Sequence, residues 1–227
     1  MNTIIVVGGS KGIGNTILKK LLHYCKVVNI SRTSPQQVHK NLTHYNCNIL
    51  NDDLPEINTA DGLVYCPGSI NLKPIARLSI DDFKNDFEIN VLGAVKVIQK
   101  YLSVLKNGNK PAIVLFSTVA VKLGMPFHAS IATSKAGVEG LVKSLGAEFA
   151  PKIRINAIAP TVTNTELASK LLRNEKMIAN ITERHPLKKF LNPDEVADMA
   201  EFLLSDKAAS LSGQVIQMDC GIVSFKI

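Results

Sequence analysis

Residues 3–25, TIIVVGGSKGIGNTILKKLLHYC, join a short apolar run to a longer amphipathic pattern through a turn that holds four glycines. The run TIIVV (3–7) predicts a buried strand, because it is continuous and rich in β-branched residues. From residue 13 the apolar residues recur at helical spacing, so we expect a helix over 13–25. Glycines between a strand and a helix let the backbone approach a pyrophosphate at the helix N-terminus. The stretch favours a dinucleotide-binding turn, and a tight turn without a ligand is the alternative.

The alternation of strand and helix continues through the rest of the chain. We expect further strands at 26–31, 45–49, 62–66, 112–117, 154–159 and 214–219, and further helices near 80–105, 129–149 and 193–205. Apolar strands that are each followed by a helix predict a parallel sheet with helices on both faces. Right-handed crossovers then give a doubly wound, Rossmann-type α/β sheet of seven strands in the order 3-2-1-4-5-6-7. We expect a single domain over 1–227, in which the polar segment 161–192 covers a substrate.

Composition and charge narrow the functional classes. The net charge of +7 comes from dispersed lysines and arginines, without a basic block interleaved with aromatic residues, which disfavours nucleic-acid binding. No apolar stretch approaches eighteen residues, and the first residues lack the basic segment of a secretory signal. The four cysteines are scattered with no CxxC pair, which is typical of reduced thiols rather than a metal site. We therefore expect a cytoplasmic protein that uses neither a membrane nor a metal.

Several motifs resemble the short-chain dehydrogenase/reductase family over nearly the whole chain. The turn GGSKGIG (8–14) is similar to the TGxxxGIG turn of that family, with Val7 in place of the usual threonine. RINAIAPTVTNTEL (154–167) resembles its sixth strand and the following loop, with Thr161 in the place of a glycine. NPDEVADMAEFLLSDKAASLSGQVIQMDCG (192–221) resembles its final helix and strand. The resemblance implies a nicotinamide-dependent oxidoreductase, similar to the 3-oxoacyl-(acyl-carrier-protein) reductases, that forms a homotetramer or homodimer.

The end of the second expected strand, NISRTS (29–34), indicates which nicotinamide is bound. A cofactor with a free 2′-hydroxyl usually meets a carboxylate there; the acidic position of the family falls at Ser31, and Arg32 follows it. Lys11 lies in the glycine turn, within reach of the same ribose. Two cations without an acid favour the 2′-phosphate of NADPH, because arginine binds phosphate through two hydrogen bonds. Two solvated surface cations are the alternative.

The resemblance also assigns the other residues of the cofactor site. They are Gly8, Ser10, Gly12, Ile13, Gly14, Asn48, Ile49, Cys66, Pro67, Gly68, Asn90, Lys135, Pro160, Thr161, Val162 and Thr165. The chain departs from the family at YCPG (65–68), where Asn-Asn-Ala-Gly is usual. Because proline fixes φ and removes a donor, we expect this turn to be reshaped beside the nicotinamide. We interpret Cys66 as a packing residue rather than a redox thiol.

The catalytic pattern of the family is incomplete in this chain. Its signature is Tyr-x-x-x-Lys; in HASIATSKAG (128–137) Lys135 fits the lysine, but Ile131 stands where the tyrosine is expected. The resemblance implies that Lys135 still binds the ribose and that Ile131 cannot transfer a proton. Thr118, thirteen residues before Ile131, takes the place of the substrate-orienting serine. Asn90 matches the asparagine that holds a relay water.

These observations leave two functional hypotheses open. The first is an NADPH-dependent reductase of a ketone, possibly a 3-oxoacyl thioester on an acidic carrier that suits the positive charge, with atypical or weak catalysis. His128, one helical turn before Ile131, would be the substitute acid. The second is an NADPH-binding pseudoenzyme that serves as a sensor or partner subunit. Either protein is expected to be a homo-oligomer, because the helix 129–149 has small residues and apolar side chains on more than one face.

Overall fold

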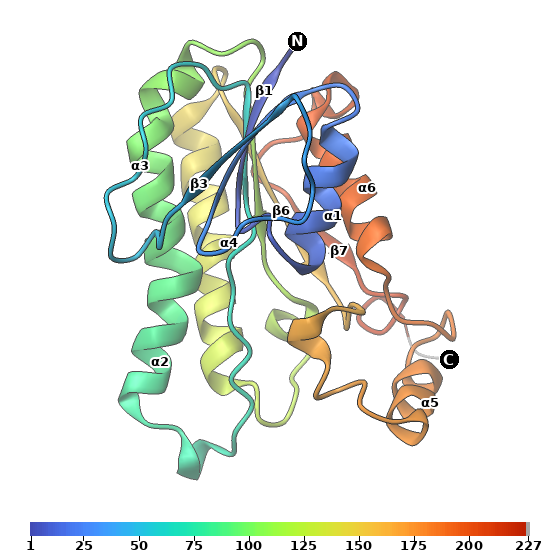
Figure 1. Cartoon of the computed structure of the whole chain (residues 1–227). Helices are drawn as coiled ribbons and strands as arrows, with labels where there is room; N and C mark the ends of the chain where they lie inside the picture. Colours follow the sequence, from blue (N-terminus) through green and yellow to red (C-terminus); the bar gives the residue numbers. More distant parts are fainter. Residues whose placement is uncertain (226–227) are drawn as a thin grey trace.

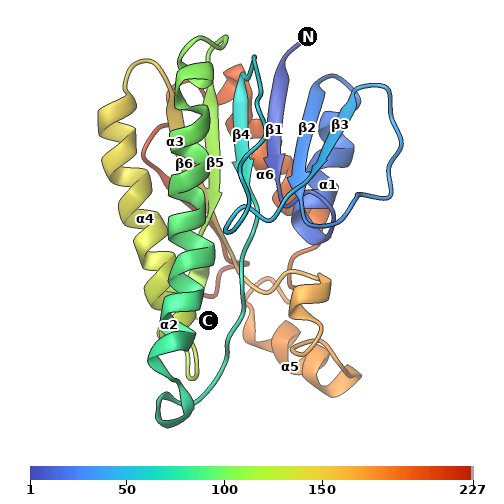
Figure 2. The same ribbon diagram turned by 60° about the vertical axis from the view of Figure 1, so that its left-hand side comes forward.

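The computed structural model describes residues 1–225 as a parallel sheet with helices on both faces. The seven strands follow the order β3-β2-β1-β4-β5-β6-β7, and every neighbouring pair is parallel. Figure 1 and Figure 2 show α3 and α4 on one side of this sheet and α1 and α6 on the other. The strand order and the two helical layers confirm the doubly wound, Rossmann-type fold that the sequence predicts.

The elements have the following bounds. The strands are β1 (Thr3–Val7), β2 (Lys26–Ser31), β3 (Leu42–Asn46), β4 (Gly62–Tyr65), β5 (Ala112–Phe116), β6 (Arg154–Pro160) and β7 (Val215–Met218). The helices are α1 (Gly12–Leu21), α2 (Ile80–Phe87), α3 (Gly93–Lys106), α4 (Ala129–Phe149), α5 (Glu175–Arg184) and α6 (Pro193–Leu204). A π-helical turn (Glu88–Leu92) joins α2 to α3, and short 3-10 turns include Val119–Val121 after β5 and Glu166–Ala168 before α5.

Two apolar clusters, one on each face of the sheet, hold the layers together. One cluster packs β1, β4 and β5 against α3 and α4 and includes Tyr101, Val138 and Ile155. The other packs the opposite sheet face against α1 and α6 and includes Leu18 and Val196. Strands β1, β4 and β5 are buried along their whole length, because helices cover both of their faces. This burial accounts for their continuous apolar runs in the sequence.

The structure moves the third strand three residues towards the N-terminus of its expected position. It runs over Leu42–Asn46 rather than 45–49, and it pairs with β2 only, at the edge of the sheet. Three of its five residues are exposed, whereas Cys47 and Ile49, which follow it, are buried. The apolar pattern therefore marked the buried turn after the strand instead of the strand itself.

Two helical expectations also need correction. The helix expected over 80–105 is interrupted by the π-turn at Glu88–Leu92, and the first helix ends at Leu21 rather than at residue 25. The segment 161–192 contains one helix, α5, and none of the residues of α5 is fully buried. Across residues 1–225, no helix has both the length and the apolarity needed to cross a bilayer. All four cysteines are free thiols.

Candidate active site

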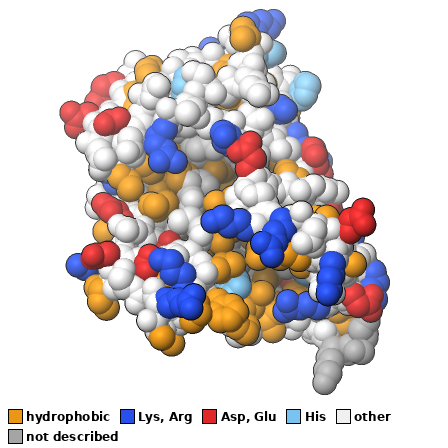
Figure 3. Space-filling model, turned by 60° about the horizontal axis from the view of Figure 1, so that its bottom comes forward, with side chains coloured by type: hydrophobic (Ala, Val, Ile, Leu, Met, Phe, Trp, Pro, Cys, Tyr) orange, Lys and Arg blue, Asp and Glu red, His pale blue; other side chains and the backbone are white. Residues whose placement is uncertain are grey.

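A cleft of about 1000 Å³, including its solvent-open part, lies where β4, β5 and β6 end. In open α/β sheets, ligands bind at the carboxyl ends of the strands, and this volume accommodates a small ligand. Figure 3, which brings the end of the molecule near α5 forward, shows lysine and arginine side chains standing among hydrophobic ones. The predicted site residues that line the cleft are Ile13, Cys66, Gly68, Thr118, His128, Lys135, Pro160, Thr161, Val162 and Thr165.

The glycine turn after β1 leaves room for a phosphate group. Gly8 and Gly12 have φ angles of +79° and +53°, which favour glycine. A Cβ on Gly14 would lie 2.3 Å from the carbonyl oxygen of Gly8, so no side chain fits there. Within the described chain, α1 begins without a capping side chain and without an acidic residue in its first turn. Its first N–H groups and its partial positive charge therefore suit a pyrophosphate.

The two predicted phosphate-binding cations differ in their surroundings. Arg32 is exposed at the end of β2, and it has no ion pair within residues 1–225. Lys11 forms an ion pair of 2.9 Å with Glu166, a partner that the sequence did not reveal. Both side chains of this pair are exposed, and such pairs contribute only about 0–1 kcal/mol, so Lys11 can exchange its partner at little cost.

The end of β2 is tied to the glycine turn by hydroxyl groups. Ser31 is buried, and its Oγ donates to the carbonyl oxygen of Thr33 at 2.9 Å. Thr33 Oγ1 in turn donates to Ser10 Oγ at 3.1 Å. The structure therefore brings Ser10, Ser31 and Arg32 to one corner of the sheet.

In the turn that follows β3, the side chain of Asn48 already has a backbone partner. Its Oδ1 accepts from the backbone N–H of Leu50 at 3.3 Å, and Ile49 beside it is buried. A Cβ on Gly8 would lie 3.1 Å from Pro67 Cδ, so the Pro67 ring lies directly against the glycine turn. The YCPG sequence therefore brings the turn after β4 into close contact with the turn after β1.

Lys135 is the buried cation of the cleft. It projects from α4, and its Nζ donates to the carbonyl oxygen of Phe116 at 2.8 Å. Burial lowers the pKa of Lys135 to about 8, while the nearby Cys66 and Asp86 act in the opposite direction. An ammonium has three donors, so two further N–H groups are available to a ligand.

The cleft wall that includes Lys135 also contains hydroxyl groups, aliphatic side chains and the imidazole of His128. Ile131, four residues before Lys135 on α4, lines the cleft and is 4% exposed. Thr118 lines the cleft, whereas the Oγ of Ser117 donates to Glu139 at 2.7 Å. His128 precedes α4, with its Nδ1 2.7 Å from the carbonyl oxygen of Pro126. The structure thus brings together the side chains that the sequence grouped as catalytic candidates.

Asn90 lies in the π-turn, and its side chain is buried. Its Nδ2 donates to the carbonyl oxygen of Asp86 at 2.7 Å and to Ser69 Oγ at 3.1 Å. Its Oδ1 is buried and has no partner among the described residues. A Cβ on Gly68 would lie 3.4 Å from this oxygen and 3.6 Å from Lys135 Nζ, so the two groups converge beside Gly68. A buried acceptor of this kind fits an ordered water or a ligand donor.

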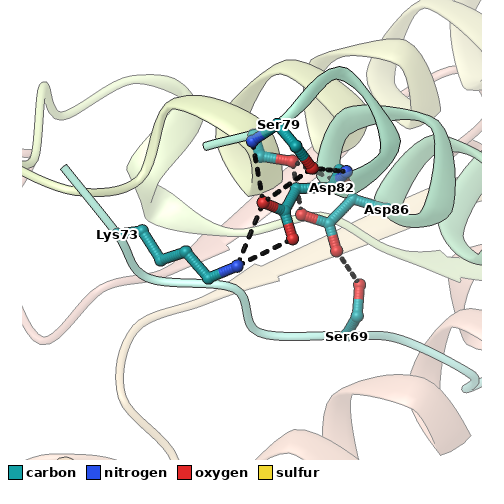
Figure 4. A network of polar contacts seen from close by, with 6 residues as sticks. Ser69, Lys73, Ser79, Asp82 and Asp86 are labelled. Carbon is teal, nitrogen blue, oxygen red and sulfur yellow. Dashed lines mark hydrogen bonds and ion pairs between the residues drawn. The ribbon is translucent and has the colours of Figure 1, made fainter. Parts of the chain in front are cut away.

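A buried carboxylate, Asp86, lies next to Asn90 and was not among the residues that the sequence indicated. Asp86 is 2% exposed, and its two oxygens accept from Ser69 Oγ and from Ser130 Oγ, each at 2.5 Å. Figure 4 shows Ser69 and Asp86 pointing towards each other, with Asp82 one turn away in contact with Lys73. The spacing to Asn90 was the available signal, because residues four apart share one helix face.

A second missed residue is buried within the segment that follows β6. His185 is buried, and its Nε2 lies 2.7 Å from Thr161 Oγ1 while its Nδ1 lies 2.7 Å from the carbonyl oxygen of Ile181. The contact fixes Thr161 at the edge of the cleft. His185 lies in a segment without clear helical or strand periodicity, so the sequence did not indicate that this histidine is buried.

Comparisons with known proteins agree with this geometry. Residues 50–223 match the family model described as enoyl-(acyl carrier protein) reductase. The chain is 30% identical to 3-oxoacyl-(acyl-carrier-protein) reductase FabG of Aquifex aeolicus, covering 96% of both proteins. It is 27% identical to carbonyl reductase (NADPH) 2 of Sus scrofa, covering 97% of this chain and 96% of the relative.

The solved structure of aldohexose dehydrogenase of Thermoplasma acidophilum, in ligand-free form, has the same fold. It superposes with a TM-score of 0.92 at 26% identity, covering 99% of this chain and 95% of that one. Sheet order, glycine turn, cleft and relatives lead to one conclusion: the chain belongs to the short-chain dehydrogenase/reductase family, a family of oxidoreductases.

Proposed function

We propose that this protein is an NADPH-dependent reductase of a ketone, with 3-oxoacyl thioesters as the substrate class to test first. The observation that carries the proposal is Lys135, a buried cation in a cleft that also presents the Thr118 hydroxyl and adjoins the glycine turn. The names of two relatives, an acyl-carrier-protein reductase and an NADPH carbonyl reductase, support the substrate class and the cofactor.

The residues of the cleft suit a nicotinamide dinucleotide. A bound reduced nicotinamide would supply a hydride to the carbonyl carbon. The N–H groups at the start of α1 would hold the pyrophosphate, and Lys135 would donate to the ribose. Thr118 would orient the carbonyl oxygen of the substrate, and the segment 161–192 would cover it, since residues 161–163, 165, 167, 168 and 171 line the cleft.

The first test concerns the choice of cofactor. Titration calorimetry should show tighter binding of NADPH than of NADH, because Arg32 and Lys11 would lie near the 2′-phosphate and β2 has no acidic residue. Arg32→Asp should weaken NADPH binding by about 1–3 kcal/mol, the scale of a charge-assisted hydrogen bond, and leave NADH binding nearly unchanged. The control is Lys19→Asp, which makes the same charge change at an exposed position in the last turn of α1, at the end of this helix away from the glycine turn. Equal affinities of the unmodified protein for the two cofactors would contradict the proposal.

One observation favours a second candidate function, an NADPH-binding pseudoenzyme that acts as a sensor or partner subunit. Ile131 presents an aliphatic side chain to the cleft one turn before Lys135, where the family pattern would offer a proton donor. This candidate predicts NADPH binding without measurable reduction of any 3-oxoacyl thioester. Turnover above the rate without protein separates the two.

We also propose that the protein is a homo-oligomer through the outer faces of α2 and α4. The reasoning from the apolar residues of α4 needs correction, because Val138 and Val142 are buried and Leu141 and Leu145 pack against the same core. The face that remains is formed by small residues of α4 together with Phe87 and Leu92, which are 40% and 51% exposed. Light scattering at micromolar concentration should give a multiple of the 24.6 kDa chain mass; a monomer mass would contradict this proposal.

A further inference from the structure

We propose that Lys135 is itself the proton donor of the reduction, and that Asp86 is the positioning residue that keeps Lys135 charged. The inference rests on the proposed function, because it concerns the proton that a ketone reduction consumes. It goes beyond that function by naming the group that donates the proton when residue 131 is an isoleucine instead of a tyrosine. It also names the carboxylate that supports this group.

Few groups in the cleft can supply a proton. The titratable side chains that line it, within the described chain, are Cys66, His128 and Lys135. Burial raises the pKa of Cys66 to about 12, which makes this thiol a weak acid. The Ser69 hydroxyl already donates to Asp86. Lys135 is buried in the wall next to Thr118 and uses one of its three N–H groups on Phe116.

The acidity of Lys135 also suits the task. A general acid works best when its pKa lies near the working pH, and burial brings the pKa of Lys135 to about 8. A lysine in water, with a pKa near 10.4, would release its proton less readily. Burial alone, however, would favour the neutral amine, so a nearby negative charge is needed to retain the proton until the substrate arrives.

Asp86 is the carboxylate placed to provide that charge. It is buried on α2, and it forms no ion pair within 4 Å among the described residues. Two serine hydroxyls, Ser69 Oγ and Ser130 Oγ, donate to its oxygens and hold the carboxylate in place. Asn90 lies between Asp86 and the Lys135 side of the cleft, since its Nδ2 donates to the Asp86 carbonyl oxygen and to Ser69 Oγ, while its Oδ1 and Lys135 Nζ both lie near Gly68.

The other charged and titratable groups near this pair are occupied elsewhere or lie to one side. Asp82, one turn before Asp86, is paired with Lys73. Glu139, one turn after Lys135 on α4, accepts a hydrogen bond from Ser117. Cys66 flanks Lys135 from the turn after β4, and His128 lies at the start of α4. Asp86 is therefore the carboxylate that stabilises the charged form of Lys135.

The step balances in protons and electrons. The carbonyl carbon gains a hydride with its electron pair, so the ketone is reduced while the nicotinamide is oxidised. The carbonyl oxygen takes a proton from Lys135 Nζ, so an N–H bond breaks and an O–H bond forms. Lys135 is left as a neutral amine and regains a proton from solvent water at the open side of the cleft that it lines.

The first arm of the test needs no cofactor. NMR of lysine Nζ or Cε nuclei, assigned with the Lys135→Arg variant, follows the titration of Lys135 in the cofactor-free protein. Asp86→Asn keeps the shape of the side chain and removes its charge, so the pKa of Lys135 should fall below its value in the unmodified protein. Asp86→Glu should restore it in part. The matched control Asp82→Asn removes a charge one turn away that Lys73 already neutralises, and it should leave the pKa of Lys135 nearly unchanged.

The second arm measures NADPH-dependent reduction against pH. Because the charged form of Lys135 is the donor, the rate should fall as pH rises through its pKa, and Asp86→Asn should move this falling limb to lower pH. Lys135→Arg should still bind NADPH and lose about 10²–10⁴-fold in turnover, because arginine does not release its proton.

Each result decides one part of the proposal. An unchanged pKa of Lys135 in Asp86→Asn overturns the role of Asp86. A pKa that moves without the pH limb overturns Lys135 as the donor. Absence of reduction at every pH defeats the proposed function together with the donor role, and the NMR arm alone then decides whether Asp86 holds the charge of Lys135.

Discussion

The two halves of the cleft are built in different ways. The half beside α1 is made of backbone: glycine φ angles, a position at Gly14 with no room for a Cβ, and helix N–H groups. The half beside α4 is made of side chains from α4, with Ile131 and Lys135 in the cleft wall, together with the buried Asp86 of α2 and Asn90 of the π-turn. Backbone cannot be replaced one group at a time, whereas side chains can. The comparison predicts that substitutions act on the two halves in different ways.

The largest expected effect on stability and cofactor affinity comes from adding one methyl group to the backbone half. In Gly14→Ala the new Cβ would lie 2.3 Å from the carbonyl oxygen of Gly8, so the turn must move. Overpacking of this kind costs about 1–3 kcal/mol, and we expect a loss of that size in the free energy of unfolding. We also expect at least about a tenfold loss in NADPH affinity, which corresponds to about 1.4 kcal/mol. Urea unfolding and titration calorimetry measure the two quantities.

A matched control exists in the same chain. Gly124 has no atom within 4 Å of the Cβ that an alanine would add, and its φ angle is not in the left-handed region. Gly124→Ala should therefore leave both stability and NADPH affinity nearly unchanged. If Gly14→Ala behaves like Gly124→Ala, the glycine turn does not form the cofactor site and the contrast between the two halves is wrong.

A change in turnover is expected from adding a hydroxyl group to the side-chain half. Ile131→Tyr places a phenol one helical turn from Lys135 on the same cleft wall as Thr118. We expect turnover on a simple ketone or an acetoacetyl thioester to rise at least about tenfold, because general acid catalysis contributes about 10²–10⁴-fold. Tyrosine is larger than isoleucine, so circular dichroism and NADPH binding must first show that the variant folds.

The same assay distinguishes the sources of the proton. A fast unmodified protein that His128→Ala inactivates would place the donor at His128 and contradict the assignment to Lys135. If turnover of the unmodified protein is slow and Ile131→Tyr does not raise it, then the missing hydroxyl at position 131 is not the only feature that limits catalysis. The YCPG turn at 65–68, which lies against the glycine turn, would then be the next segment to alter.

Sequence reasoning located most elements because buried parallel strands have continuous apolar runs. It placed β1, β2 and α4 at their observed bounds. It displaced β3, where the edge of the sheet is exposed and the next buried residues belong to a turn. It missed the π-turn that holds Asn90, since one additional residue in a helical turn leaves no periodic signal over so short a stretch.

The sequence by itself determined the strand order, the glycine turn and the identity of the candidate residues, because each depends on local composition and on a chain path that short right-handed crossovers restrict. Only the tertiary structure decided which charges meet. Lys11 and Glu166 are 155 residues apart and form an ion pair, and Asp86 and Ser130 are 44 residues apart and share a buried hydrogen bond. Contacts between distant segments depend on how the helices pack on the sheet, and that packing is not encoded in any local pattern.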